Sequence, residues 1–103
     1  MSNTDPVTVL CIYRVKDGQA EAFRGLVASH WSTLDRLGLV SSKPPQWYVT
    51  EDEKKRTCFV EIFEWKDGDA PKTAHELPEV MAIWEPMGAL VEHMEFLDIE
   101  PIR

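Results

Sequence analysis

The sequence has few basic residues, few cysteines and no long apolar run, and each shortage excludes a class of protein. Its 11 lysines and arginines are outnumbered by 18 aspartates and glutamates, so the formal net charge is −7. A field of that sign repels phosphate backbones and anionic lipid surfaces, which argues against nucleic-acid and membrane partners. No stretch approaches the ~20 apolar residues that span a bilayer, and the polar N-terminus lacks the layout of a secretion signal. We therefore expect a cytoplasmic protein.

Motifs for metals, nucleotides and disulfides are missing as well. His30, His75 and His93 show no metal-ligand spacing, and there is no glycine-rich phosphate loop. We therefore expect no cofactor. The two cysteines, Cys11 and Cys58, lie inside apolar runs that read as strands. Buried reduced thiols are the favoured interpretation, with a disulfide or a redox role as the alternatives.

What remains is the composition of one ordinary globular domain. The chain has 103 residues, of which 44% are hydrophobic and 28% charged. We expect residues 1–103 to form a single domain with a flexible segment at 1–6. Runs of β-branched and aromatic residues predict strands at 7–15, 46–51, 57–65 and 94–99.

Two apolar stripes with three- and four-residue spacing predict the helices. The first follows Asp17, a candidate N-cap, and ends near Gly38. A short helical segment then opens with Pro71 in its first turn, and a second apolar stripe starts at Pro78. Pro86 lies inside that stripe and should kink or split the helix, because proline lacks the backbone donor.

A short motif recurs at the two predicted junctions between strand and helix. The sequence KDG at 16–18, followed by Ala20, returns as KDG at 66–68, followed by Ala70. Both halves then read as strand, turn, helix and strand. A doubled βαβ unit with right-handed crossovers is the ferredoxin-like α+β fold, with a four-stranded antiparallel sheet and two helices on one face.

Both faces of this predicted sheet are apolar. Tyr13 and Phe63 point to one side, whereas Ile12 and Ile62 point to the other. An exposed apolar face of that size needs a partner, and loops of one chain lack the residues to cover it. We expect a homodimer through the open face of the sheet, which would form a dimeric α/β barrel.

The segments FEWKDG at 63–68 and AHELPEV at 74–80 carry a family pattern. A tryptophan ends the third strand, an acidic turn follows, and a histidine opens the last helix. This pattern resembles the antibiotic biosynthesis monooxygenase-like proteins of the dimeric α/β-barrel superfamily. The resemblance implies a pocket between sheet and helices, lined by Trp65 and His75. Haem-degrading relatives use an asparagine on the first strand, and the only asparagine here is Asn3, so we do not expect haem degradation.

Aromatic and imidazole side chains are the candidates for this pocket. His75 could bind a ligand oxygen or move a proton, or it could cap a helix or face water. Trp65 and Trp84 could hold a flat ligand between them, although plain core packing explains Trp84 equally well. His30 could look into the same cleft as a ligand-binding residue, or it could be a core histidine with its hydrogen bonds satisfied.

Glu61 is the candidate catalytic carboxylate beside His75. Strand alternation places it on the same face as Phe63, and a carboxyl group in apolar surroundings could serve as a base. Alternatively it pairs with an arginine or lysine, or accepts a hydrogen bond from Tyr13 or Tyr48. Tyr13 is also a candidate ligand-binding residue.

Three functions therefore stay open. The first is a cofactor-independent monooxygenase-like oxidoreductase that acts on an aromatic or polyketide-like compound. The second is a protein that binds a small hydrophobic or aromatic ligand without converting it. The third is a structural homodimer of the stress-responsive α/β-barrel type. Four tryptophans in the chain favour a ligand pocket over a filled core.

Overall fold

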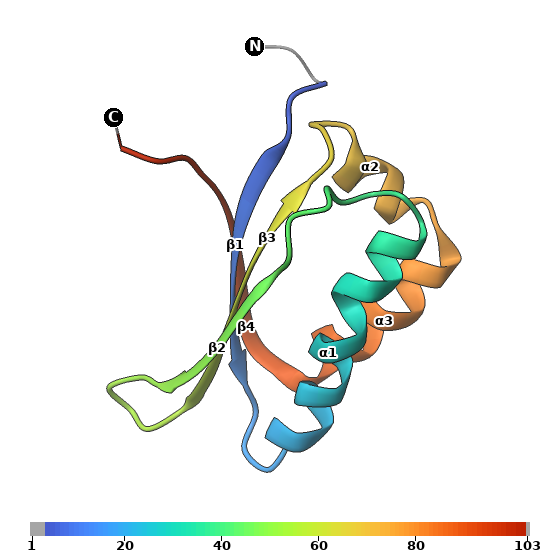
Figure 1. Cartoon of the computed structure of the whole chain (residues 1–103). Helices are drawn as coiled ribbons and strands as arrows, with labels where there is room; N and C mark the ends of the chain where they lie inside the picture. The colour runs from blue at the N-terminus through green and yellow to red at the C-terminus, as the bar shows by residue number, and fades with distance from the viewer. Residues whose placement is uncertain (1–3, 103) are drawn as a thin grey trace.

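The strands and helices follow one another along the chain in the predicted order (Figure 1). The computed structural model describes residues 4–102, so residues 1–3 of the segment expected to be flexible lie outside it. The elements are β1 (Val7–Val15), α1 (Ala20–Arg36), β2 (Gln46–Glu51), β3 (Thr57–Trp65), α2 (Ala70–His75), α3 (Pro78–Leu90) and β4 (Val91–Ile99).

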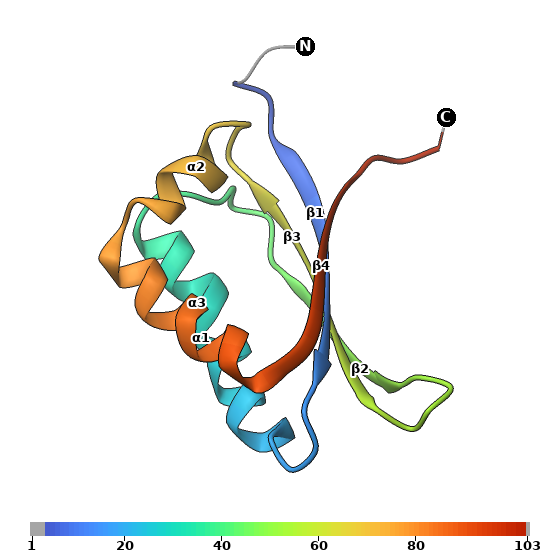
Figure 2. The same cartoon turned by 180° about the vertical axis from the view of Figure 1, so that it is seen from behind.

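The four strands form one antiparallel sheet with the order β2-β3-β1-β4. All three helices cover the same face of this sheet, as the two opposite views show (Figures 1 and 2). The arrangement is the predicted ferredoxin-like α+β fold. The last strand begins at Val91 rather than at residue 94, because the ladder with β1 extends to the pair of Val15 and Val91. Helix α3 therefore passes into β4 without a loop.

The predicted helix signals are only partly correct. Helix α1 begins after Gln19, and no side chain caps it, so the prediction of Asp17 as N-cap is wrong. The cause is Gly18, whose positive φ of 78° turns the chain once more before the helix starts. Gly38 has a φ of 74° and follows the end of the helix, as its sequence position indicates. At the second junction between strand and helix, which joins β3 to α2, Asp67 Oδ1 accepts hydrogen bonds from the backbone amides of Asp69 and Ala70, both at 2.9 Å.

Pro86 does not split the last helix. Helix α3 runs unbroken from Pro78 to Leu90 with Pro86 inside it, so the expected split is wrong. Val80 and Met87, on either side of the proline, are 0% and 3% exposed. Burial of both side chains anchors the two halves of the helix in the core and outweighs the single hydrogen bond that proline removes.

The core lies between the sheet and the helices. Residues of β1 and β3 that alternate toward the helices pack against apolar residues of α1 and α3, among them Tyr13, Phe23, Leu34, Phe59 and Val80. Tyr13 and Phe23 contact each other with ring centroids 5.0 Å apart. Both cysteines are buried and free, which confirms their prediction as reduced thiols.

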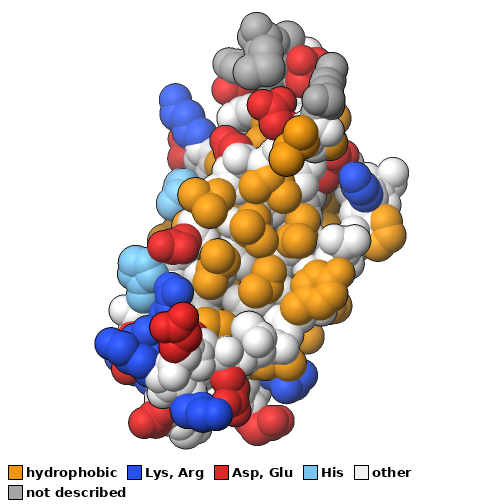
Figure 3. Space-filling model, turned by 90° about the vertical axis from the view of Figure 1, so that its left-hand side faces the viewer, with side chains coloured by type: hydrophobic (Ala, Val, Ile, Leu, Met, Phe, Trp, Pro, Cys, Tyr) orange, Lys and Arg blue, Asp and Glu red, His pale blue; other side chains and the backbone are white. Residues whose placement is uncertain are grey.

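The sheet face that the helices leave uncovered, hereafter the open face, carries a continuous apolar patch (Figure 3). Cross-strand register places the same-face neighbours Leu10, Ile62 and Leu97 at its centre. Tyr48 and Leu97 are 56% and 49% exposed. The prediction of a sheet with two apolar faces is therefore confirmed. Between residues 4 and 102, no helix has the length and apolar character needed to cross a membrane.

Candidate functional site

A pocket of about 420 Å³ opens between the sheet and the helices α2 and α3. Its volume lies within the range of about 300–1,000 Å³ that small-molecule sites occupy. The walls are mostly apolar and aromatic and include Phe63, Trp65, Trp84, Met87, Met94 and Phe96. Such walls suit a flat organic molecule with few charges.

Strand alternation and the short helix α2 explain which side chains meet in the pocket. Tyr13 on β1 and Trp65 on β3 point toward the helices, because each occupies the inward phase of its strand. His30, His75 and Trp84 approach from α1, α2 and α3. All five of these residues line the pocket, whereas Glu61 does not.

His30 has both ring nitrogens engaged in hydrogen bonds. Trp84 Nε1 donates to His30 Nε2 at 2.8 Å, and His30 Nδ1 lies 2.9 Å from Glu61 Oε1. An indole nitrogen can only donate, so Nε2 of His30 is the acceptor. The ring proton of the neutral imidazole must therefore sit on Nδ1 and be donated to the carboxylate. His30 is thus a satisfied core histidine that also forms part of the pocket wall.

Glu61 is fully buried and accepts hydrogen bonds from three side chains. Tyr13 Oη donates to Oε1 at 2.8 Å, His30 Nδ1 donates to the same oxygen, and Trp47 Nε1 donates to Oε2 at 3.0 Å. Of the alternatives raised by the sequence, the hydrogen bond with Tyr13 is the one formed. Within residues 4–102, no arginine or lysine forms an ion pair with Glu61. Convergent donors therefore stabilise the carboxylate in place of a cation.

The position of Glu61 bears on its expected role. It lies behind Tyr13 and His30, out of the pocket lining, and its oxygens are occupied by donors. A base must reach the proton that it removes, at about 2.6–3.2 Å between heavy atoms. The hydrogen bond from His30 Nδ1 to Glu61 holds the imidazole in place, and a role of Glu61 as a base stays a prediction.

Trp47 is the member of this network that sequence reasoning missed. It lies on β2, directly opposite Glu61 in the antiparallel register with β3. Its side chain is partly exposed at the sheet edge, with 46% of the residue accessible. The sequence signal that could have identified Trp47 is the short hairpin between 46–51 and 57–65. The register of that hairpin sets which residues face each other across the two strands.

The charge of Glu61 also affects two neighbouring groups on β1. Burial, reinforced by that charge, raises the pKa of Tyr13 far above its ordinary value, so its hydroxyl stays protonated and donates. Burial and then the same charge raise the pKa of Cys11 to about 12. Cys11 therefore presents a neutral thiol to the pocket and not a reactive thiolate.

His75, by contrast, is exposed and uncommitted. It is the last residue of α2, and its ring packs edge-on against Trp84 with centroids 4.7 Å apart. Its ring nitrogens form no hydrogen bond with any residue from 4 to 102. Trp84 thus separates two histidines, a buried one with both nitrogens engaged and an exposed one whose nitrogens are available to a ligand.

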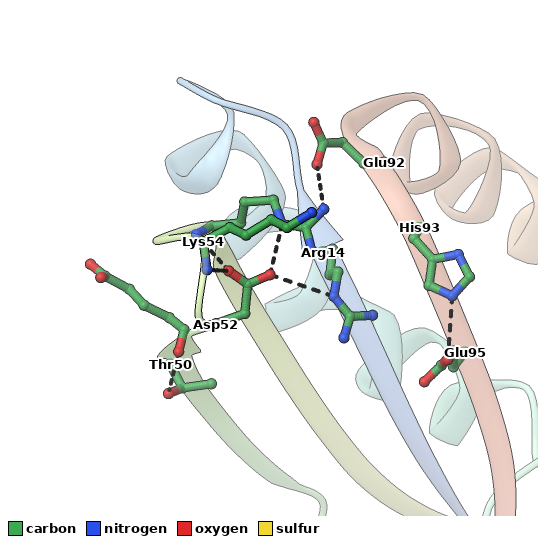
Figure 4. A network of polar contacts seen from close by, with 9 residues as sticks. Arg14, Thr50, Asp52, Lys54, Glu92, His93 and Glu95 are labelled. Carbon is green, nitrogen blue, oxygen red and sulfur yellow. Dashed lines mark hydrogen bonds and ion pairs between the residues drawn. The ribbon is translucent and has the colours of Figure 1, made fainter.

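A second polar network lies away from the pocket, around the β2–β3 hairpin (Figure 4). Asp52 accepts hydrogen bonds from the backbone amides of Lys54 and Arg56 and from Arg56 Nε, the last at 2.7 Å. Arg14 Nε on β1 lies 3.7 Å from the same carboxylate, and Arg56 also reaches Glu92 at 3.6 Å. The network ties the hairpin to β1 and β4, so its role is structural.

Metal ligands do not gather anywhere in the part of the chain that the structure describes. No group of three or more histidine, cysteine, aspartate or glutamate side chains is placed to hold a metal ion there.

Comparison with solved structures identifies the same fold in several bacterial proteins. SnoaB, a cofactor-independent oxygenase from Streptomyces nogalater, aligns with a TM-score of 0.73 and 22% identity, over 96% of this chain and 95% of that one. A Chloroflexus aurantiacus protein assigned to the antibiotic biosynthesis monooxygenases aligns with a TM-score of 0.69 and 18% identity, over 96% and 95% of the two chains. A NIPSNAP family protein from Agrobacterium tumefaciens aligns with a TM-score of 0.72 and 17% identity, over 99% and 90%.

These likenesses confirm the ferredoxin-like architecture that the sequence resemblance implied. At such low identity they establish the fold alone. No protein-family model matches the sequence, and no curated protein matches it.

Proposed function

We propose that this chain binds a flat aromatic or polyketide-like molecule in the pocket and oxidises it as a cofactor-independent monooxygenase. The observation that carries the proposal is the combination of aromatic walls with one imidazole, His75, whose nitrogens are uncommitted. The fold shared with a cofactor-independent oxygenase supports it.

Each pocket residue has a distinct task in this proposal. The rings of Trp65 and Trp84 hold the faces of the ligand, since offset aromatic contacts favour planar molecules. His75 accepts a proton from an activated methylene group of the ligand. The resulting carbanion is electron-rich enough to reduce molecular oxygen. One oxygen atom becomes the new carbonyl, and the other leaves as water with the two hydrogens of the methylene group.

The pair of His30, in the pocket wall, and Glu61, outside the lining, supports this chemistry. Glu61 fixes the tautomer of His30, and His30 in turn accepts the indole proton of Trp84. The indole plane is thereby held in one orientation before the ligand arrives. Preorganisation of this kind lowers the entropy that binding costs.

Binding without conversion is the second candidate, and the exposure of His75 favours it. A carbanion that reacts with oxygen needs protection from water, which a closed site provides. His75 lies at an exposed position, where it is suited to donate or accept a hydrogen bond from a ligand oxygen.

We also propose that two copies of the chain pair through the open face. The patch around Leu10, Ile62 and Leu97 has an apolar centre. Acidic and basic side chains gather at one end of this face (Figure 3). An apolar centre with a polar rim is the usual layout of a protein interface. A second copy is the simplest partner, because one self-complementary patch then covers both exposed faces.

Measurements of oxygen uptake and of tryptophan fluorescence distinguish the two candidate functions, oxidation of the ligand and binding without conversion. The protein is mixed with anthrone, a tricyclic compound that has an activated methylene group, in air and under argon. Quenching with oxygen uptake above the uncatalysed rate supports the enzyme, and quenching without uptake supports the binder. His75→Ala should abolish uptake while quenching remains, and Asp52→Asn, outside the pocket, should leave both unchanged. Absence of quenching and of uptake would contradict both candidates.

A further inference from the structure

The mouth of the pocket carries negative charge and no positive charge. Glu85 of α3 and Asp98 of β4 are exposed residues of the lining. They come from opposite walls, one from the helix layer and one from the sheet. No lysine or arginine lines the pocket among the residues that the structure describes.

Neither carboxylate forms an ion pair with a residue between 4 and 102. The ion pairs formed by described residues involve other carboxylates, such as Asp52 and Glu79, and none includes Glu85 or Asp98. The chain as a whole carries a net charge of −7, so its overall field has the same sign. A ligand entering the pocket therefore meets two uncompensated negative charges.

Nor do the described lysines and arginines supply a cation to the interior of the pocket. A carboxylate ligand would lose its hydration among Phe63, Trp65 and Met87 without gaining a cation. The buried histidine cannot replace one, because His30 Nδ1 already donates to Glu61 and Nε2 is occupied by Trp84. An uncharged phenol has neither cost, and its hydroxyl can donate to the free nitrogen of His75 or to a carboxylate at the mouth.

We infer that the pocket selects uncharged aromatic molecules bearing hydroxyl groups and rejects aromatic carboxylates, with Glu85 and Asp98 as the residues that set this preference. The inference rests on the proposed function, since it specifies the ligand class of the same pocket. It is separate from whether the ligand is oxidised.

A matched pair of ligands tests the inference. Binding of 2-naphthol and 2-naphthoate to the full chain is measured by tryptophan quenching and calorimetry at pH 8. We expect 2-naphthol to bind at least about tenfold more tightly than 2-naphthoate. High salt should narrow this ratio, because it screens exposed charges.

Two double variants test whether Glu85 and Asp98 cause the difference in affinity between the two ligands. Glu85→Gln combined with Asp98→Asn should narrow the ratio about threefold or more by improving naphthoate binding. Glu51→Gln combined with Glu53→Gln removes the same number of charges from the exposed hairpin and should leave the ratio unchanged. Equal binding of the two ligands by the unmodified chain, or a ratio unaltered in the pocket variant, would overturn the selectivity alone. Failure of both ligands to bind would overturn the pocket and, with it, the selectivity.

Discussion

Trp84 donates its indole proton to His30 at 2.8 Å, and this contact joins a wall of the pocket to a buried imidazole. The two residues are 54 positions apart and belong to α3 and α1. Behind them, Glu61 accepts a hydrogen bond from Nδ1 of His30, so the pocket wall rests on a series of hydrogen bonds that reaches the sheet. The first two predictions concern these hydrogen bonds.

The tautomer of His30 is the first prediction. Because Trp84 donates to Nε2, the ring of His30 should be neutral with its proton on Nδ1. Nitrogen-15 NMR of imidazole-labelled protein at neutral pH should show a protonated Nδ1 and an unprotonated Nε2. Trp84→Phe keeps the aromatic wall but removes the donor, so the Nε2 resonance should shift. A doubly protonated His30 in the unmodified protein would contradict the hydrogen bond from Trp84 to His30.

Replacement of Glu61 tests how much its three hydrogen bonds contribute to the free energy of unfolding. Glu61→Gln replaces one of the two acceptor oxygens by an amide donor, so at least one of the donors Tyr13, His30 and Trp47 loses its acceptor. We expect the free energy of unfolding to fall by about 2–3 kcal/mol, measured by urea denaturation. Tyr13→Phe removes one hydrogen bond and leaves no unpaired donor, so it should cost only about 1 kcal/mol. A Glu61→Gln protein as stable as the unmodified one would exclude an important role for this carboxylate.

Alkaline stability depends on Cys11. Burial raises the pKa of this thiol from 9.0 to about 12 in the folded chain. The folded state therefore holds the proton more tightly than the unfolded state. The resulting stabilisation is complete below pH 9 and is lost as the pH rises toward 12. The thiol should contribute a slope of up to about 1.4 kcal/mol per pH unit within that window.

Denaturation at pH 8, 9.5 and 11 measures this effect. Cys11→Ala should show a shallower decline with pH than the unmodified protein. A residual decline is expected from Tyr13, whose pKa is also raised in the folded state. Parallel declines in the two proteins would show that Cys11 does not titrate differently on folding.

Acid stability depends on the hairpin network. The amide of Arg56, and further hydrogen bonds from the same hairpin, hold the pKa of Asp52 below its usual value. Its contribution is therefore present above the unfolded pKa of about 3.9 and is lost as the pH falls below it. Asp52→Asn should be less stable than the unmodified protein at pH 7, and the difference should shrink toward pH 2.5. A difference that stays constant over this range would argue against an ionised Asp52 as its source.

The open face should govern self-association. Leu97→Glu places a charge in the centre of the patch, where the side chain is half exposed in the single chain and folding should be unaffected. Sedimentation equilibrium should show a dimer for the unmodified protein and a monomer for this variant. Val49→Glu is a matched control, because Val49 is 52% exposed but faces the helix side of the sheet. Monomeric unmodified protein at tens of micromolar would contradict the proposed dimer.

Local periodicity was sufficient to predict the architecture. Two-residue alternation on β1 and β3 indicated which side chains face the helices, and spacings of three and four indicated α1 and α3. These patterns are readable because each depends on neighbours along the chain. Where a local signal met tertiary packing, the expected split was wrong: Pro86 stays inside an unbroken helix, and the core holds residues on both of its sides.

The hydrogen-bonded chain behind the pocket was decided by the tertiary structure. Glu61 is 48 residues from Tyr13, 31 from His30 and 14 from Trp47. These partners come from different elements, and their meeting depends on strand register and helix packing, which alternation alone does not specify. The sequence by itself determined that Glu61 faces the core. Only the fold decided that three donors would surround it there.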